Sequence, residues 1–242
     1  MSIAYDAVSS LGSSSTSGSS FNWNHTPVGT PKGVVVFTFT NANADDATAV
    51  TYGGVSMTAV TGGRAVDTAG EPGDCKVWFL GSGVLTGTQS IVVTRNASGN
   101  GMTGIALTVT SSQDSDIHTA GIVLAEGDQV LSEKSPTDGS SGTGNSLYVA
   151  GVFSGCDSFQ TTIFTSFPSP SVLYPGANST WRAGFDFGTT VCGVVTRTNV
   201  GTGAQAVGFI TALTPTEDTA AVHFAIKDVV ASAARRRIFI ID

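Results

Sequence analysis

The sequence predicts an all-β protein, an antiparallel β-sandwich of jelly-roll type. Apolar and polar residues alternate with a period of two along most of the chain, and long amphipathic helical patterns are missing. Clusters of Gly, Asn, Asp, Ser and Pro interrupt the alternation about every 10–15 residues, which is the rhythm of a sandwich. Hydrophobic residues fill 40% of the 242 positions and charged residues 12%. The chain therefore has enough apolar side chains for a core and a surface rich in Ser, Thr, Asn and Gly.

The first strands can be justified from their residues. Residues Phe21–His25 alternate large rings with asparagines, which predicts a strand with one aromatic face. Gly33–Thr40 (GVVVFTFT) is apolar and β-branched enough to lie centrally in a sheet. Val50–Val60 predicts a hairpin around Gly53-Gly54, because glycines accept the positive φ of a primed two-residue turn.

Further strands follow the same pattern over the rest of the chain. They are expected near Lys76–Leu80, Gln89–Arg95, Thr103–Thr110, Ser146–Phe153, Thr161–Phe167, Trp181–Phe187, Val191–Arg197, Ala204–Leu213 and Thr219–Val229. Asp228–Ala234 is the one helical candidate and could equally continue a strand. Residues that we expect to be mostly buried are Trp23, Phe37, Phe39, Tyr52, Trp78, Leu80 and Phe224.

Two low-complexity segments bear on domain organisation. Ser9–Ser20 (SSLGSSSTSGSS) predicts a polar loop between the first two strands. Ser135–Asn145 is a second such segment and marks a possible boundary between two lobes. We interpret residues 1–230 as a single sandwich domain and residues 231–242 as a C-terminal tail.

Charge and cysteine content narrow the possible partners. The net charge of −7 and pI of about 4.7 disfavour nucleic acid, because an acidic surface repels phosphate. No apolar run approaches the roughly 18 residues of a membrane helix, and the N-terminus lacks the pattern of a signal peptide. We therefore expect synthesis in the cytoplasm and no membrane partner. Three cysteines far apart in sequence predict buried free thiols rather than disulfides.

A search for catalytic chemistry points away from an enzyme. The sequence has no G-x-S-x-G turn, and the three histidines, His25, His118 and His223, are far apart. Close-spaced Cys and His pairs, which a zinc site would need, are missing. Acidic loop residues could bind calcium, and the candidates are Asp45 with Asp46, Asp114 with Asp116, and Asp67 with Glu71 and Asp74. Solvated acids are the simpler interpretation, so we predict neither an essential metal nor a cofactor.

The tryptophans raise the question of sugar binding. Trp23 and Trp78 lie within alternating strands, where core packing is the expected role. Trp181 follows the polar loop of residues 175–180 and is the candidate for stacking on a ligand such as a host-surface glycan.

Five segments carry a shared pattern of turn glycines and core aromatics: FNWNHT (Phe21–Thr26), GVVVFTFTN (Gly33–Asn41), AVTYGGVSMTAV (Ala49–Val60), KVWFLGSGVLTGTQSIVVT (Lys76–Thr94) and GIALTVTSSQDSD (Gly104–Asp116). Together they resemble a loosely defined β-sandwich family that recurs in phage structural proteins and bacterial surface proteins. The resemblance covers roughly residues 2–230. It implies the fold through turn glycines and core aromatics, and it implies a function only by analogy.

These observations favour a non-enzymatic structural protein in the virion of a tailed phage. The expected roles are a capsid decoration (cement) protein, a head fibre or a tail-associated component. A carbohydrate-binding or adhesion module is the alternative, and a hydrolase on the same fold is a third hypothesis.

The C-terminal tail departs from the family pattern and suggests how copies assemble. Its residues Arg235, Arg236 and Arg237 are followed by Ile238, Phe239, Ile240 and Ile241. This segment either forms the last strand of its own sandwich or adds as a strand to a partner, which would be another copy or a capsid or tail protein.

Overall fold

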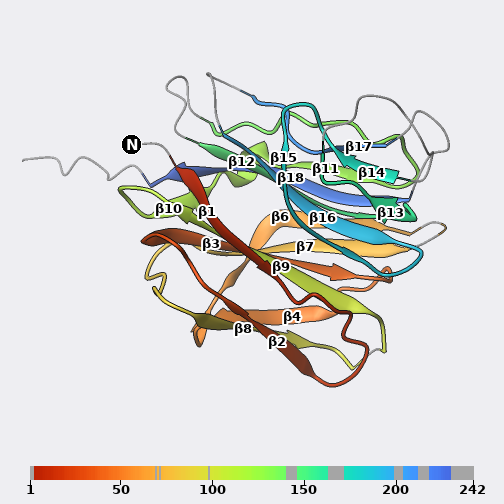
Figure 1. Cartoon of the computed structure of the whole chain (residues 1–242), viewed down its shortest axis with the longest axis horizontal. Coiled ribbons are helices and arrows are strands. Elements are labelled where there is room, and N and C mark those ends of the chain that lie inside the picture. Colours follow the sequence, from red (N-terminus) through yellow and green to blue (C-terminus); the bar gives the residue numbers. More distant parts are fainter. Residues whose placement is uncertain are drawn as a thin grey trace, which may run out of the picture.

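The computed structural model describes residues 3–68, 70, 72–97, 99–139, 146–162, 172–198, 204–211 and 218–229. It confirms the all-β antiparallel sandwich. The described residues form strands β1 to β18 and one short 3-10 helix, η1 (Thr119–Gly121). Their sheets lie in layers, one above another (Figure 1). None of these residues belongs to a helix long and apolar enough for a membrane span.

The N-terminal half forms the two sheets of a jelly roll. Its strands are β1 (Ala4–Ser10), β2 (Ser20–His25), β3 (Pro31–Thr40), β4 (Ala47–Tyr52), β5 (Val55–Ser56), β6 (Thr58–Asp67), β7 (Gly73–Leu80), β8 (Gln89–Arg95) and β9 (Met102–Thr110). The central sheet has the order β1-β9-β3-β7-β6 and the outer sheet the order β2-β8-β4-β5. Successive strands from β1 to β4 alternate between the two sheets, and so do β7, β8 and β9, which is the connectivity of interlocked Greek keys.

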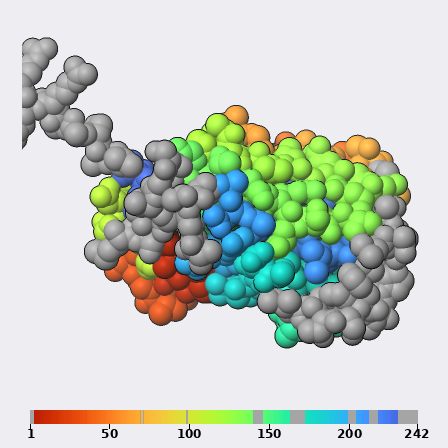
Figure 2. Space-filling model, turned by 90° about the horizontal axis from the view of Figure 1, so that it is seen from above, coloured from red at the N-terminus to blue at the C-terminus, as the bar shows by residue number. Residues whose placement is uncertain are grey.

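The C-terminal half adds two further layers. The six-stranded sheet contains β10 (Ser115–Ile117), β11 (Val123–Glu126), β12 (Leu147–Ser154), β15 (Thr180–Asp186), β16 (Val191–Thr198) and β18 (Thr219–Asp228). The short sheet contains β13 (Ser158–Phe159), β14 (Val172–Pro175) and β17 (Phe209–Ile210), and its β13-β14 pair is parallel. Figure 2 looks down on this side of the molecule, where yellow-green segments before β12 cover much of the surface.

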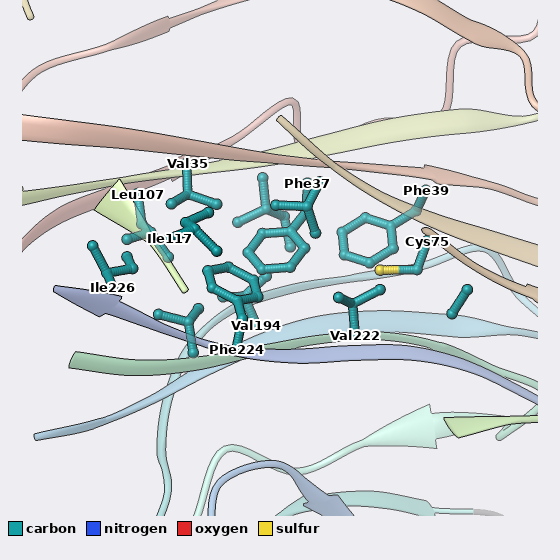
Figure 3. Close-up of a cluster of buried hydrophobic side chains, with 14 of the residues drawn as sticks. Val35, Phe37, Phe39, Cys75, Leu107, Ile117, Val194, Val222, Phe224 and Ile226 are labelled. Carbon is teal, nitrogen blue, oxygen red and sulfur yellow. The ribbon is translucent and has the colours of Figure 1, made fainter. Parts of the chain in front are cut away.

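Strand β3 shows why the sequence carries an unbroken apolar run. Val34 and Val36 pack in the cluster between the central and outer sheets. Val35, Phe37 and Phe39 point the other way, toward Val194, Val222, Phe224 and Ile226 of the six-stranded sheet (Figure 3). Because side chains alternate across a strand, a strand buried on both faces needs apolar residues at successive positions.

The predicted core residues and turn are found with one difference. Trp23, Phe37, Phe39, Tyr52, Trp78 and Phe224 are buried, whereas Leu80 lies at the edge of its cluster and is partly exposed. Gly53 and Gly54 have φ of 56° and 82°, and the pair Tyr52–Val55 closes the two-residue turn that the sequence predicts. All three cysteines are buried, and none of them forms a disulfide.

Glycines let aromatic rings cross between the layers. A Cβ atom on Gly104 would overlap the indole of Trp23, and one on Gly151 would overlap the ring of Phe37. The same holds for Gly73 beneath the ring of Phe153. Each pair joins a strand of one sheet to a ring from the facing sheet, so the missing side chain brings the two layers close together.

The strands of the C-terminal half differ more from the sequence prediction. Within the predicted strand Ala204–Leu213, the described residues pair as a strand at Phe209–Ile210, and Thr161 and Thr162 lie outside strands. Strands β10, β11, β13 and β14 were not predicted, since each has no more than four residues. The helical candidate was Asp228–Ala234; Asp228 ends β18, and residues 230–234 lie outside the described part of the chain. Residues 140–145 of the possible lobe boundary also lie outside it.

Candidate functional site

A hydrogen-bonded relay at one end of the jelly roll is the arrangement that most resembles a catalytic triad. Ser9 Oγ lies 2.8 Å from His25 Nδ1, and His25 Nε2 lies 3.1 Å from Thr108 Oγ1. The Thr108 hydroxyl donates to Asp6 Oδ2 over 2.9 Å. Since Thr108 donates to the carboxylate, its oxygen accepts from His25 Nε2–H, which leaves Nδ1 to accept from Ser9.

The hydrogen bonds of this relay link neighbouring strands, and its histidine is a poor general base. Burial lowers the pKa of His25 to about 4, although the charge of Asp6 opposes this shift. A general base works best with a pKa near the operating pH, so a histidine that titrates near 4 is a weak base at neutral pH. The Ser9 oxygen also accepts from Trp23 Nε1 at 3.1 Å. The relay therefore connects β1, β2 and β9 through side chains that are already hydrogen-bonded to one another.

The other two histidines lie elsewhere in the fold. His118 Nδ1 is 3.4 Å from Lys227 Nζ, beside η1. His223, on β18, is buried under the short-sheet layer, and its Nδ1–H donates to the Val123 carbonyl over 3.2 Å. Its Nε2 has no hydrogen-bond partner among the described residues. Burial lowers the pKa of His223 to about 4, so the imidazole is neutral in the folded protein near pH 7.

Three carboxylates meet where β6, β11 and β18 come together. Ligand oxygens of Asp67, Asp128 and Asp218 all lie within 4.8 Å of one another. Asp67 is buried and accepts from the Thr219 amide over 2.5 Å, whereas Asp128 is exposed. The hydrogen bond and the charge of Asp218 raise the pKa of Asp128. Oxygen donors of this kind suit calcium or magnesium, but calcium takes about 6–8 oxygens, so backbone or water would have to supply the others.

The acidic residues predicted from sequence are placed in different surroundings. Asp67 belongs to the three-carboxylate cluster, Glu71 lies outside the described residues, and Asp74 pairs with Arg64 Nε at 2.5 Å. Burial raises the pKa of Asp74 to about 7, although Arg64 pulls it down. The sequence search missed Asp128 and Asp218, because they are 90 positions apart and meet through the pairing of β11 with β18.

The other predicted calcium pairs also separate. Asp45 forms an ion pair with Lys76 at 2.7 Å. Asp46 is buried and accepts from Asn100 Nδ2 at 2.8 Å. Asp114 and Asp116 are exposed and line a groove of about 580 Å3.

That groove runs along the edges of the central and six-stranded sheets. Its walls are the start of β6, the end of β7, the strand β10 and the last described residue of the chain. The lining residues are Thr58, Ala59, Val60, Thr61, Phe79, Leu80, Gly81, Ser82, Asp114, Ser115, Asp116, Ile117, Thr119 and Val229. Its volume is within the roughly 300–1,000 Å3 usual for ligand sites.

The tryptophans are packed inside the protein to different degrees. Trp23 and Trp78 are buried in the core between the outer and central sheets. Trp181 is partly buried, stacks on Phe159 with ring centroids 4.9 Å apart, and lies over Gly184 and Gly193. Its ring thus contacts Phe159 on β13 and Phe209 on β17, and it lies against the backbone of β15 and β16. The predicted docking residues Arg235 to Ile241 lie outside the described residues.

The fold places the chain in the class of antiparallel jelly-roll sandwiches, here extended by a third and a fourth layer. Comparisons with protein-family models, with curated proteins and with solved structures found no match.

Proposed function

We propose that the protein is a non-enzymatic structural component of a virus particle, with a tailed phage as the source. Capsid decoration, head fibre and tail-associated component are the roles that we consider. The observation that carries the proposal is the jelly roll formed by β1 to β9. This architecture is common in capsid proteins, and the argument is one of analogy between folds.

The use of polar side chains supports a structural role. Ser9, His25, Thr108 and Asp6 are hydrogen-bonded across three strands rather than arranged around a substrate cavity. The charged side chain of Arg95 likewise donates to backbone carbonyls of Ser15 and Asn100, and so fixes a loop. Such hydrogen-bond networks rigidify a fold. The polar groups in them are used in bonds between parts of the protein, which suits a structural role.

The alternative, a carbohydrate-binding or adhesion module, has less support. Sugar-binding modules present aromatic rings to solvent, whereas Trp23 and Trp78 are buried and Trp181 stacks on Phe159. A host-surface glycan therefore remains a secondary hypothesis. A hydrolase has the least support because the acid of the Ser9 relay reaches His25 through Thr108 rather than directly.

The test is binding to particles. Particles are prepared from cells in which the gene for this chain has been deleted, and the purified chain is added before sedimentation in a density gradient. We expect saturable cosedimentation at a fixed copy number. A chain that stays at the top of the gradient with every particle preparation would contradict the proposal.

A further inference from the structure

The groove between the two sheet edges has the form of a strand-docking site. β6 is the last strand of the central sheet, and β10 is at the end of the six-stranded sheet. Pairing between β6 and β7 lapses after Ala59 and resumes at Arg64, so Val60 and Thr61 leave the ladder where they line the groove. Edge strands with free backbone groups can accept an added strand from another chain.

The groove is lined by apolar side chains and has acidic side chains at its rim. Val60, Phe79, Leu80 and Ile117 supply apolar lining, and Val229 adds a side chain that is 44% exposed. Asp114 and Asp116 are exposed beside them, and neither forms an ion pair with another described residue. A ligand that fits this surface has apolar side chains next to cationic ones.

The sequence of the chain contains such a segment a few residues beyond the groove. Val229 lines the groove and is the last described residue. Six positions further on begins Arg235–Arg237, which is followed directly by the apolar run Ile238–Ile241. The arginines match the two aspartates in charge, and the apolar run matches the groove lining.

The pairing of β18 disfavours one way in which the tail of the same chain could return. Near its end, β18 is paired on one side with β10, through Ser115–Asp228, and on the other with β12, through Leu147–Ile226. A segment that turned back as a hairpin would need one of these occupied flanks. The tail of a neighbouring molecule needs no hairpin return along β18.

We propose that the groove binds residues 235–241 of a second copy of this chain, so that copies assemble through their C-terminal tails. The docked strand adds to the edge at Thr58–Thr61, its apolar residues contact Phe79 and Val229, and its arginines face Asp114 and Asp116. The inference stands on the groove and the tail sequence and does not depend on association with a particle. It goes beyond the proposed function because it names the binding site and its occupant.

Charge exchange in the full-length chain tests this interface. Self-association is measured by sedimentation velocity over a range of concentrations. We expect the wild type to associate. The double variant Asp114→Lys, Asp116→Lys should associate about tenfold more weakly, because the attraction between these positions and the arginines of the docked tail becomes repulsion. The tail variant with Arg235, Arg236 and Arg237 replaced by Glu weakens association to a similar extent. Combining both sets of changes restores it.

Two further variants keep the test specific. Asp157→Lys reverses a single charge at an exposed aspartate beyond the other end of β12, and it leaves association unchanged. Ile240→Asp removes an apolar contact in the tail without altering any described strand, and it weakens association. A wild type that is monomeric at every concentration would overturn the inference, since the tail would then bind in its own chain or nowhere. Unchanged association of the groove variant, or no rescue by the combined changes, would overturn it as well.

Discussion

Replacing Gly151 by alanine probes the contact between the central and six-stranded sheets. A Cβ atom at this position would overlap the ring of Phe37, which is fully buried. Overpacking of a core costs about 1–3 kcal/mol. Alanine has less backbone entropy than glycine in the unfolded chain, which offsets about 0.4–1 kcal/mol of that cost. We expect Gly151→Ala to lower the free energy of unfolding by about 1–2 kcal/mol, measured by urea denaturation with an unchanged m value.

A double-mutant cycle with Phe37→Ala identifies the cause. Phe37→Ala alone is expected to cost about 3–5 kcal/mol. The double variant should lose at least about 1 kcal/mol less than the sum, because the new methyl group enters the space that the ring vacates. Gly155→Ala is the control, since the nearest atom to its added Cβ would be 3.4 Å away, and we expect a change within about 0.5 kcal/mol. A neutral Gly151→Ala, or strict additivity in the cycle, would refute the reasoning.

Three further predictions concern burial and charge. Trp78→Ala should cost about 3–5 kcal/mol in chemical denaturation, because the indole is buried and its Nε1 donates to Thr38 at 3.2 Å; a loss below about 1 kcal/mol would contradict its burial. The pKa of His223 is lowered from 6.5 to about 4, so its stabilisation is present above pH 6.5 and is lost as the pH falls toward 4. Over this pH range the free energy of unfolding of the wild type should fall by about 3 kcal/mol more than that of His223→Gln. Comparing the two proteins cancels the opposite contribution of Asp74, whose pKa is raised. Parallel pH profiles of the two proteins would show that His223 is not responsible. Asp128→Asn should raise the melting temperature, because it relieves repulsion from Asp67 and Asp218. A chelator should leave the melting temperature of the wild type unchanged. A fall in the melting temperature on adding chelator would reveal a bound cation.

Much of the fold could be predicted because the strands of the jelly roll carry strong local patterns. Alternation at Phe21–His25 and the turn glycines Gly53 and Gly54 depend on neighbours in sequence. The number of layers could not be predicted in this way. The run Gly33–Thr40 predicts a strand that lies centrally in a sheet, but the sequence alone does not say that a separate sheet covers each of its faces.

The candidate sites were less predictable because they depend on contacts between distant segments. Asp128 and Asp218 meet through the register of β11 and β18, and the groove forms where β6 comes close to β10. The sequence identifies Asp114 and Asp116 as a pair, with solvated acids or candidate calcium ligands as the interpretations, and does not show that they form the rim of a groove. Gly104 and Gly151 lie within strands that the sequence predicts, but their role depends on the rings of Trp23 and Phe37 in another sheet.

The central claim is that this chain is a structural component of a virus particle. The most direct measurement is quantitative mass spectrometry of gradient-purified particles from cells that express the gene. The account predicts that the chain cosediments with the particle in a constant ratio to the major capsid protein, at a copy number that reflects the symmetry of its site. Recovery of the chain solely in fractions that contain no particles would contradict the account.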